Sequence, residues 1–133
     1  MTHDDLIAAL EKATGPNREL DVAIWEAVDP AIVRRVRQDA RALSPKGSSD
    51  ADLARAERSR LAKMATAYTA SLDAAMTLIP HVEPRTHWHL QAYPHGCYSA
   101  TVSDTYPVGT HYGGQHMTSP ALALCIAAMK ART

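Results

Sequence analysis

Phenylalanine is absent from this sequence of 133 residues, cysteine occurs only twice, and basic and acidic side chains balance at 14 each. The two cysteines, Cys97 and Cys125, do not have the spacing of a zinc site or a redox motif, so we expect reduced thiols. Zero net charge excludes a protein that binds nucleic acid through a generally basic surface. No apolar run approaches the roughly 20 residues that span a bilayer. The first residues lack the basic segment and apolar stretch of a secretory signal, and we expect a cytoplasmic protein.

The short motifs of several enzyme classes are also missing. The sequence contains neither G-x-x-x-x-G-K-[ST] nor G-x-G-x-x-G, and this excludes nucleotide hydrolysis by a P-loop. It contains no G-x-S-x-G nucleophile elbow, although counting residues does not exclude a Ser-His-Asp triad. The sequence shows no set of residues with the pattern of a known catalytic site. We therefore expect a protein that is not an enzyme, and the sequence alone leaves catalysis open.

Large apolar side chains are scarce. Hydrophobic residues make up 46% of the chain, but 24 of them are alanine, and leucine, isoleucine, valine and methionine together supply 28. Alanine favours helix and allows helices to approach closely. The length fits one domain spanning residues 1–133, with a thin core that depends strongly on its few large side chains.

The first part of the chain has the periodicity of helices. Apolar residues recur at helical spacing in five segments that begin at N-cap residues and end near glycine, proline or a polar turn. The expected N-caps are Thr2, Asn17, Asp29, Ser49 and Thr69. Near the other end of the chain, Ser119-Pro120 opens a segment to Met129 that is apolar all round, which predicts a helix buried on several sides.

Between these helical regions the apolar period changes to two. Residues 88–92 and 98–102 alternate, and Pro94-His95-Gly96 between them has the form of a three-residue hairpin loop. Pairing Tyr93 with Cys97 puts the apolar residues of both strands on one face, because it sets Leu90 opposite Ala100. A third strand is expected at Tyr106 to Tyr112, as an edge ended by Gly113-Gly114.

These patterns together predict the fold class. We expect an α+β protein with a small antiparallel three-stranded meander at about residues 86–112. Helices cover this meander, with a helical region before it and a buried helix after it.

Three segments carry a resemblance to a known family: Gly15–Asp21, Tyr68–Pro80 and Ser119–Lys130, together with a strand that contains tryptophan. With them the chain is similar to the small phage and prophage proteins that have an α-β-α sandwich domain, called the phage ABA sandwich family. The resemblance covers about residues 3–28 and 68–132. Residues 29–67 depart from the family pattern and form a helical insertion relative to it.

The resemblance implies a phage or prophage origin, the cytoplasm of a bacterial host as the location, and a sheet covered by helices. It supplies no catalytic residues. Whatever is particular to this protein is expected in the helical insertion.

Six of the seven histidines fall between His81 and His116. On a strand, His87 and His89 project from the same side, and neutral imidazoles at that spacing can share a divalent metal. The other ligands would come from His111, His116 or Asp104. Alternatives are a polar, partly exposed sheet face and a pH-sensitive or interface role.

The polar side of the hairpin is unusual because it has no charged residue. It includes Gln91 and Tyr93, opposite Ser99 and Cys97. We expect a partner or the extra helices to cover this face, because a solvated sheet face ordinarily carries charges. A Cys97–His pair across the hairpin is geometrically feasible, but no oxyanion or orienting motif accompanies it.

Charge is unevenly distributed along the chain. Residues 1–30 hold seven acidic and two basic side chains, a net charge of −5, and residues 31–63 hold nine basic and four acidic ones, a net charge of +5. The two blocks either neutralise each other or leave an arginine patch for a phosphate or an acidic protein. The partner-binding residues that we predict are Arg34, Arg37, Arg41, Arg55, Arg58, Gln91 and Tyr93.

These observations lead to two functional hypotheses. The first is a non-enzymatic accessory protein of phage or prophage origin that binds a host factor, with counter-defence as its role. The second is a small metal-binding or ligand-sequestering protein that uses His87, His89, His111 and His116. The expected partner is a host or phage protein or a small ligand, since no helix-turn-helix glycine turn or basic arm supports duplex recognition. The alanine-rich helices and the uncharged sheet face favour a homodimer.

Overall fold

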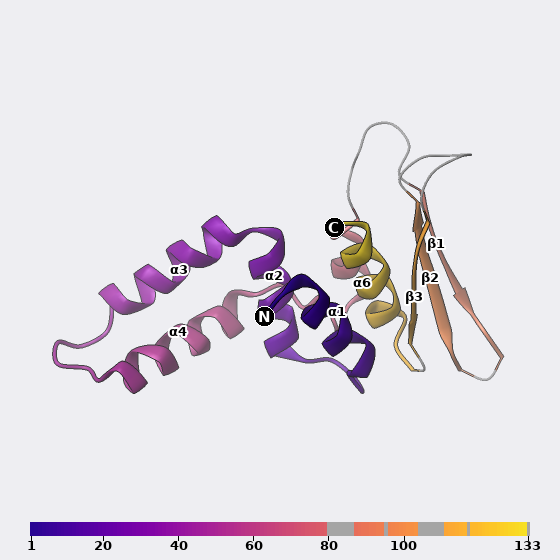
Figure 1. Ribbon diagram of the computed structural model, residues 1–133. Helices are drawn as coiled ribbons and strands as arrows, with labels where there is room; N and C mark the ends of the chain where they lie inside the picture. Colours follow the sequence, from indigo (N-terminus) through magenta and orange to yellow (C-terminus); the bar gives the residue numbers. More distant parts are fainter. Residues whose placement is uncertain (80–86, 95, 104–110, 117, 133) are drawn as a thin grey trace.

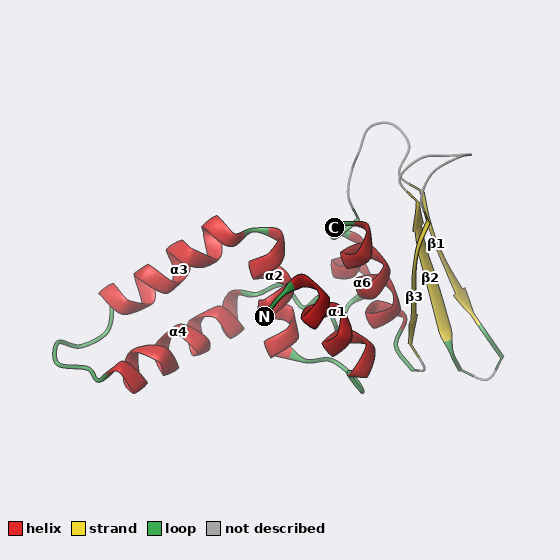
Figure 2. Ribbon diagram, in the orientation of Figure 1, coloured by secondary structure: helices red, strands yellow, loops and turns green. Residues whose placement is uncertain are grey.

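The structure is a computed structural model, and it describes residues 1–79, 87–94, 96–103, 111–116 and 118–132. Within these residues, five helices precede the sheet, namely α1 (His3–Lys12), α2 (Arg18–Val28), α3 (Pro30–Ala42), α4 (Asp50–Met64) and α5 (Leu72–Met76). The strands are β1 (His87–Ala92), β2 (Tyr98–Ser103) and β3 (His111–His116), and α6 (Pro120–Ala131) follows them. The predicted α+β class is confirmed (Figure 2).

Most of the described helices begin where a local side chain accepts a free backbone N–H, whereas at α3 the side chain of Asp29 makes no such bond and Pro30 opens the helix. Thr2 and Ser49 each form a capping box, and Asn17 accepts the N–H of Leu20. The prediction of Thr69 as a cap is wrong. Ser71 caps α5 instead, because the hydroxyl of Thr69 is bound to Asp21, far away in the sequence.

The sheet is an antiparallel meander in the order β1-β2-β3. Leu90 lies opposite Ala100 and Trp88 opposite Val102, as the pattern predicts. The N–H of Tyr93 donates to the carbonyl of Cys97 at 2.9 Å, and Gly96 has a φ of +89°, a conformation that favours glycine. Turn chemistry and apolar alternation thus determine one register.

The third strand lies later than predicted. It spans His111–His116, so Gly113 and Gly114 lie within it, while Tyr106 to Thr110 fall outside the described residues. Gly114 is needed there because β3 packs directly on α6. A Cβ at this position would lie 2.3 Å from the carbonyl oxygen of Ala123. Glycine is therefore a site of close approach in this strand and does not end it.

Helix α6 is the centre of the core. Every residue from Ala121 to Met129 is buried, and the helix packs against β2 and β3 on one side and against α5 and α1 on others. This confirms the predicted helix buried on several sides. Its four alanines in this stretch give it the narrow profile that lets the sheet approach.

The helices among the described residues all lie on the α6 side of the sheet (Figure 1). The other sheet face carries positions 89, 91, 99, 101, 113 and 115. The expectation that the extra helices cover this polar face is therefore wrong, since α3 and α4 lie at the opposite end of the molecule. No helix in the described ranges is long and apolar enough to cross a membrane.

Helices α3 and α4 form a hairpin, which we call the arm (residues 29–65), that extends away from α6 and the sheet (Figure 1). It has a small apolar cluster of its own, made of Val33, Val36 and Leu61. Val22 and Trp25 of α2 pack against this cluster. The remaining helices and the sheet share one larger core, and we call them the core unit.

The close approach of β3 to α6 predicts that Gly114→Ala destabilises the protein by about 2–3 kcal/mol, because the added methyl group meets backbone atoms that cannot move aside. Gly113→Ala is the matched control, since nothing lies within 4 Å of its Cβ, and it should change stability by less than about 1 kcal/mol. Urea unfolding followed by circular dichroism measures both changes. Equal stability of the two variants would contradict the proposed contact.

Candidate functional site

A groove of about 720 Å³ lies where the arm meets α2, and it is the candidate functional site. One wall comes from the first turns of α2, and the other comes from α4, with Arg37 of α3 between them. The lining residues are Arg18, Glu19, Val22, Arg37, Ala54, Arg55, Glu57, Arg58, Ser59, Leu61 and Ala62. The groove thus combines four arginines with several small or apolar side chains.

The sequence of α4 explains how this groove forms. Arg55 and Arg58 lie three residues apart on one helix face, and both are exposed. Leu61, one turn further on, is buried against Val33 and Val36 of α3. The arginines therefore stand beside the apolar seam of the arm. Guanidinium groups in such a position can bind carboxylates by paired hydrogen bonds while their aliphatic stems cover apolar surface.

Arg37 is held in place by an acidic side chain of α2. Its two terminal nitrogens donate to the two carboxylate oxygens of Glu26 at 2.6 and 3.1 Å. These hydrogen bonds lower the pKa of Glu26 below its ordinary value. The pair links the acidic block of the sequence to the basic one, so part of the predicted neutralisation between the two blocks is present.

The predicted arginines divide into paired and unpaired ones. Arg41 is bound to Glu57 and lies outside the groove, and Arg55 has only a long ion pair of 3.8 Å with Asp52. Arg34 and Arg58 are exposed and form no ion pair with any described residue. Three of the predicted arginines, Arg37, Arg55 and Arg58, line the groove, and the other two do not.

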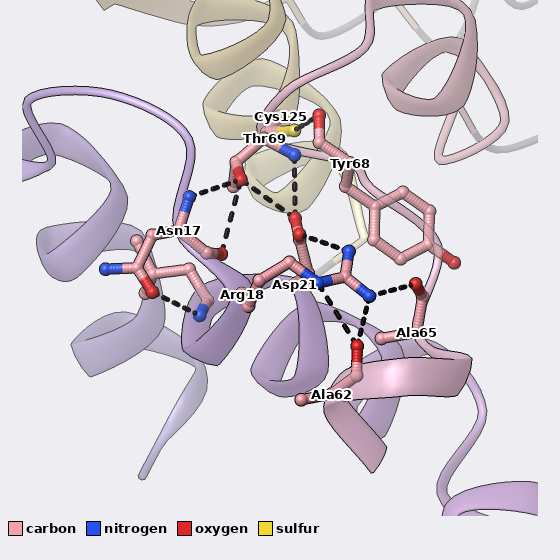
Figure 3. Close-up of polar contacts among 9 residues, drawn as sticks. Asn17, Arg18, Asp21, Ala62, Ala65, Tyr68, Thr69 and Cys125 are labelled. Atoms are coloured by element: carbon pink, nitrogen blue, oxygen red, sulfur yellow. Dashed lines mark hydrogen bonds and ion pairs between the residues drawn. The ribbon is translucent and has the colours of Figure 1, made fainter. Parts of the chain in front are cut away.

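Arg18 lines the groove too, and the sequence analysis missed it. Its guanidinium donates to the carbonyls of Ala62 and Ala65 at the end of α4 and to the carboxylate of Asp21 at 2.9 Å (Figure 3). Asp21, only 1% exposed, also accepts from the N–H of Thr69 at 2.8 Å and from its hydroxyl at 2.9 Å. We call these contacts the Asp21 clasp.

The Asp21 clasp joins three parts of the chain. Asp21 and Arg18 belong to α2, while Thr69 belongs to the segment that follows the arm. On the other side of this segment, the thiol of Cys125 in α6 lies 3.3 Å from the carbonyl of Tyr68 and donates to it. One feature of the sequence indicates that Asp21 is buried. Asp21 lies three residues before the buried Ile24, on the apolar side of α2.

The two predicted hairpin residues, Gln91 and Tyr93, are exposed but do not belong to the groove. The sheet and the arm lie at opposite ends of the molecule (Figure 1). The predicted partner-binding residues therefore do not form one surface, and the groove alone is the candidate site.

The predicted histidine ligands are divided by the sheet. The register places strand positions 87, 89 and 111 on one face and position 116 on the face toward α6. His89 is exposed, whereas the side chains of His87 and His111, and all of Asp104, fall outside the described residues. Within the described part of the chain, no three metal-ligating side chains come together.

His116 has a structural role that explains its burial. Its Nδ1 accepts the N–H groups of Thr118 and Ser119 at 3.2 and 3.0 Å, so its Nε2 bears the proton and donates to the carbonyl of Ala13 at 2.5 Å. The imidazole thus holds the turn into α6 against the end of α1. Both nitrogens are used in these contacts, so His116 is not placed to bind a metal or to act as a base for Cys97.

Comparisons with family models, curated proteins and solved structures return no match to this chain. The groove's own chemistry is therefore the basis for a functional proposal.

The Asp21 clasp predicts that Asp21→Ala lowers the free energy of unfolding by about 3–5 kcal/mol, because it leaves the buried N–H of Thr69 without its acceptor and the guanidinium of Arg18 without its carboxylate. Glu19→Ala is the control, since it removes an exposed carboxylate from the same helix turn and should cost less than about 1 kcal/mol. Chemical unfolding monitored by tryptophan fluorescence measures both. An Asp21→Ala midpoint equal to that of the wild type would contradict the role of the clasp.

The two cysteines should differ sharply in reactivity. Burial, together with the nearby Asp21 carboxylate, raises the pKa of the Cys125 thiol to about 12, and the thiolate is the reactive form. Cys97 is only half-buried. We expect iodoacetamide at pH 8 to label Cys97 in the native protein and Cys125 only after denaturation, as measured by mass spectrometry of peptides. Equal labelling of both in the native state would contradict the packing of α6.

Proposed function

We propose that this protein acts by binding an acidic protein surface in the groove between α2 and the arm. The observation that carries the proposal is that Arg37, Arg55 and Arg58 line one groove together with the apolar side chains of Val22 and Leu61. Carboxylates of a partner would pair with the guanidinium groups of Arg55 and Arg58, since Arg37 is already bound to Glu26, and apolar side chains of the same partner would contact Val22 and Leu61.

A protein partner suits this site better than a nucleic acid. The groove is lined in part by apolar side chains such as Val22, Ala54 and Leu61, and a sugar-phosphate backbone has no apolar side chains to pack against them. The arm exposes three large apolar side chains, Ile32, Leu43 and Met64. Apolar side chains interspersed with arginine are typical of protein interfaces, where arginine is enriched and lysine is depleted.

The resemblance of the chain to phage ABA sandwich proteins extends the proposal to a host protein as the partner. In this proposal the arm, which departs from the family pattern, carries the specific contact, and counter-defence is the biological role. The protein performs no chemistry on its partner, and its effect comes from occupying the partner's surface.

The proposal predicts that the double variant Arg55→Ala/Arg58→Ala weakens partner binding at least about tenfold, because each lost charged hydrogen bond costs about 1.5–3 kcal/mol. The matched control is Arg35→Ala/Arg60→Ala, which removes the same charge from exposed positions of the arm outside the groove, and it should change affinity less than about twofold. Partners captured from a bacterial lysate are identified by mass spectrometry, purified, and titrated by fluorescence anisotropy.

Three results would overturn the proposal. Equal losses of affinity in the two double variants would show that binding depends on the total charge of the arm and not on the groove. A captured partner whose cross-links map to the sheet and not to the arm would place the interface elsewhere. Tighter binding of duplex DNA than of any captured protein, with a steep salt dependence, would point to a nucleic acid partner.

A further inference from the structure

Strand β1 is an edge strand of the described sheet. The sheet order leaves its outer side without a neighbouring strand among the described residues. The N–H of Tyr93 donates to Cys97 across the hairpin, and backbone groups alternate along an antiparallel pair. This alternation turns the N–H and C=O groups of Trp88, Leu90 and Ala92 away from β2, where another strand could bind them.

The same edge carries apolar side chains that α6 does not cover. Trp88 and Leu90 lie opposite Val102 and Ala100, which are buried in the core, so they belong to the face of the sheet toward α6. Helix α6 packs mainly on β2 and β3. Trp88 is consequently 38% exposed, and Leu90 is only partly buried.

Strand β1 also lacks the features that keep edge strands from pairing. Its sequence, His-Trp-His-Leu-Gln-Ala, contains no lysine, no other charged residue of the Asp, Glu, Lys or Arg type, and no proline. In proteins that remain monomeric, edge strands usually contain such residues or are covered by a helix or loop. An uncharged edge with an apolar strip favours a partner strand of the same character.

We propose that β1 is the interface with a second copy of this chain, and that the two β1 strands pair antiparallel to form one six-stranded sheet. A twofold axis perpendicular to the sheet at His89 sets Trp88 opposite Leu90 of the partner subunit, and the reverse contact follows by symmetry. Because this axis preserves the faces of the sheet, α6 of both copies lies on the same side. The paired Trp88 and Leu90 side chains then fill the space between the two helices.

The pairing satisfies two separate requirements at once. It gives the outward backbone groups of β1 their hydrogen-bond partners, and it buries apolar area beyond the reach of α6. A second copy meets both with the same residues, whereas an unrelated strand would need matching apolar positions of its own. The interface is independent of the groove, because the groove is lined by α2, α3 and α4, and these helices are separated from the sheet by α6 (Figure 1).

The test is the oligomeric state of the full chain, measured by sedimentation velocity over a range of concentrations. We expect a dimer for the wild type and, for Trp88→Lys, a dissociation constant at least about tenfold higher, because each copy then places a charge in the apolar strip. Gln115→Lys puts the same charge on the exposed face of β3, the opposite edge strand, and should leave the dimer intact.

Hydrogen exchange of the wild type gives a second readout that does not depend on any variant folding. The amides of Trp88 and Leu90 should exchange more slowly at concentrations where the dimer forms than after dilution. A wild type that is monomeric at every concentration would overturn the proposal. So would a dimer whose β1 amides gain no protection, or one that Gln115→Lys disrupts and Trp88→Lys does not.

Discussion

The buried carboxylate of Asp21 is the contact on which the arrangement of this molecule depends. A charge that is almost fully removed from water must be paired and hydrogen-bonded, and Asp21 has both kinds of partner in Arg18 and Thr69. The bonds from Thr69 to Asp21 hold the segment that follows the arm against α2. The carboxylate of Asp21 also fixes Arg18, which uses its other nitrogens to hold the end of α4. The arm is thus attached to α2 at both of its ends, and the groove exists because of this attachment.

The core unit follows a different principle, in which small residues replace large ones. Ala121, Ala123, Ala127 and Ala128 are all buried in α6, and Gly114 lies directly against this helix. Helix and sheet therefore approach so closely that few large side chains are needed between them. This explains how a chain without phenylalanine builds a core, and why its few leucines and isoleucines cluster around α6.

Local rules predicted the parts of the fold that local interactions determine. Capping residues such as Thr2 and Ser49 act within one helix turn, and Gly96 with the alternation of apolar residues determines the β1-β2 register. The errors arise where distant residues compete. The local pattern predicts a cap at Thr69, because the bond of Thr69 to Asp21, 48 positions away, does not show in a short stretch of sequence. The pattern also predicts a strand end at Gly114, because the neighbouring Ala123 belongs to a later helix.

The candidate site was predictable to a similar extent. The spacing of Arg55 and Arg58 on one helix indicated a basic face, but the position of that face relative to α2 depends on how the arm folds back. Arg18 was missed because a single arginine beside an acidic residue has no distinctive pattern. The histidines were grouped by density along the chain, whereas the register separates position 116 from the others.

The separate apolar cluster of the arm has a consequence for its dynamics. Val33, Val36 and Leu61 are the buried apolar side chains of this cluster, and each contributes about 1.5–3 kcal/mol at most. The core unit shares none of these three side chains, so the arm can open locally at a lower free energy than the whole protein unfolds. A partner seated in the groove would bind only the closed form, and its binding energy would therefore add to the stability of the arm. The same surface that recognises a partner is then also the part of the molecule that the partner orders most.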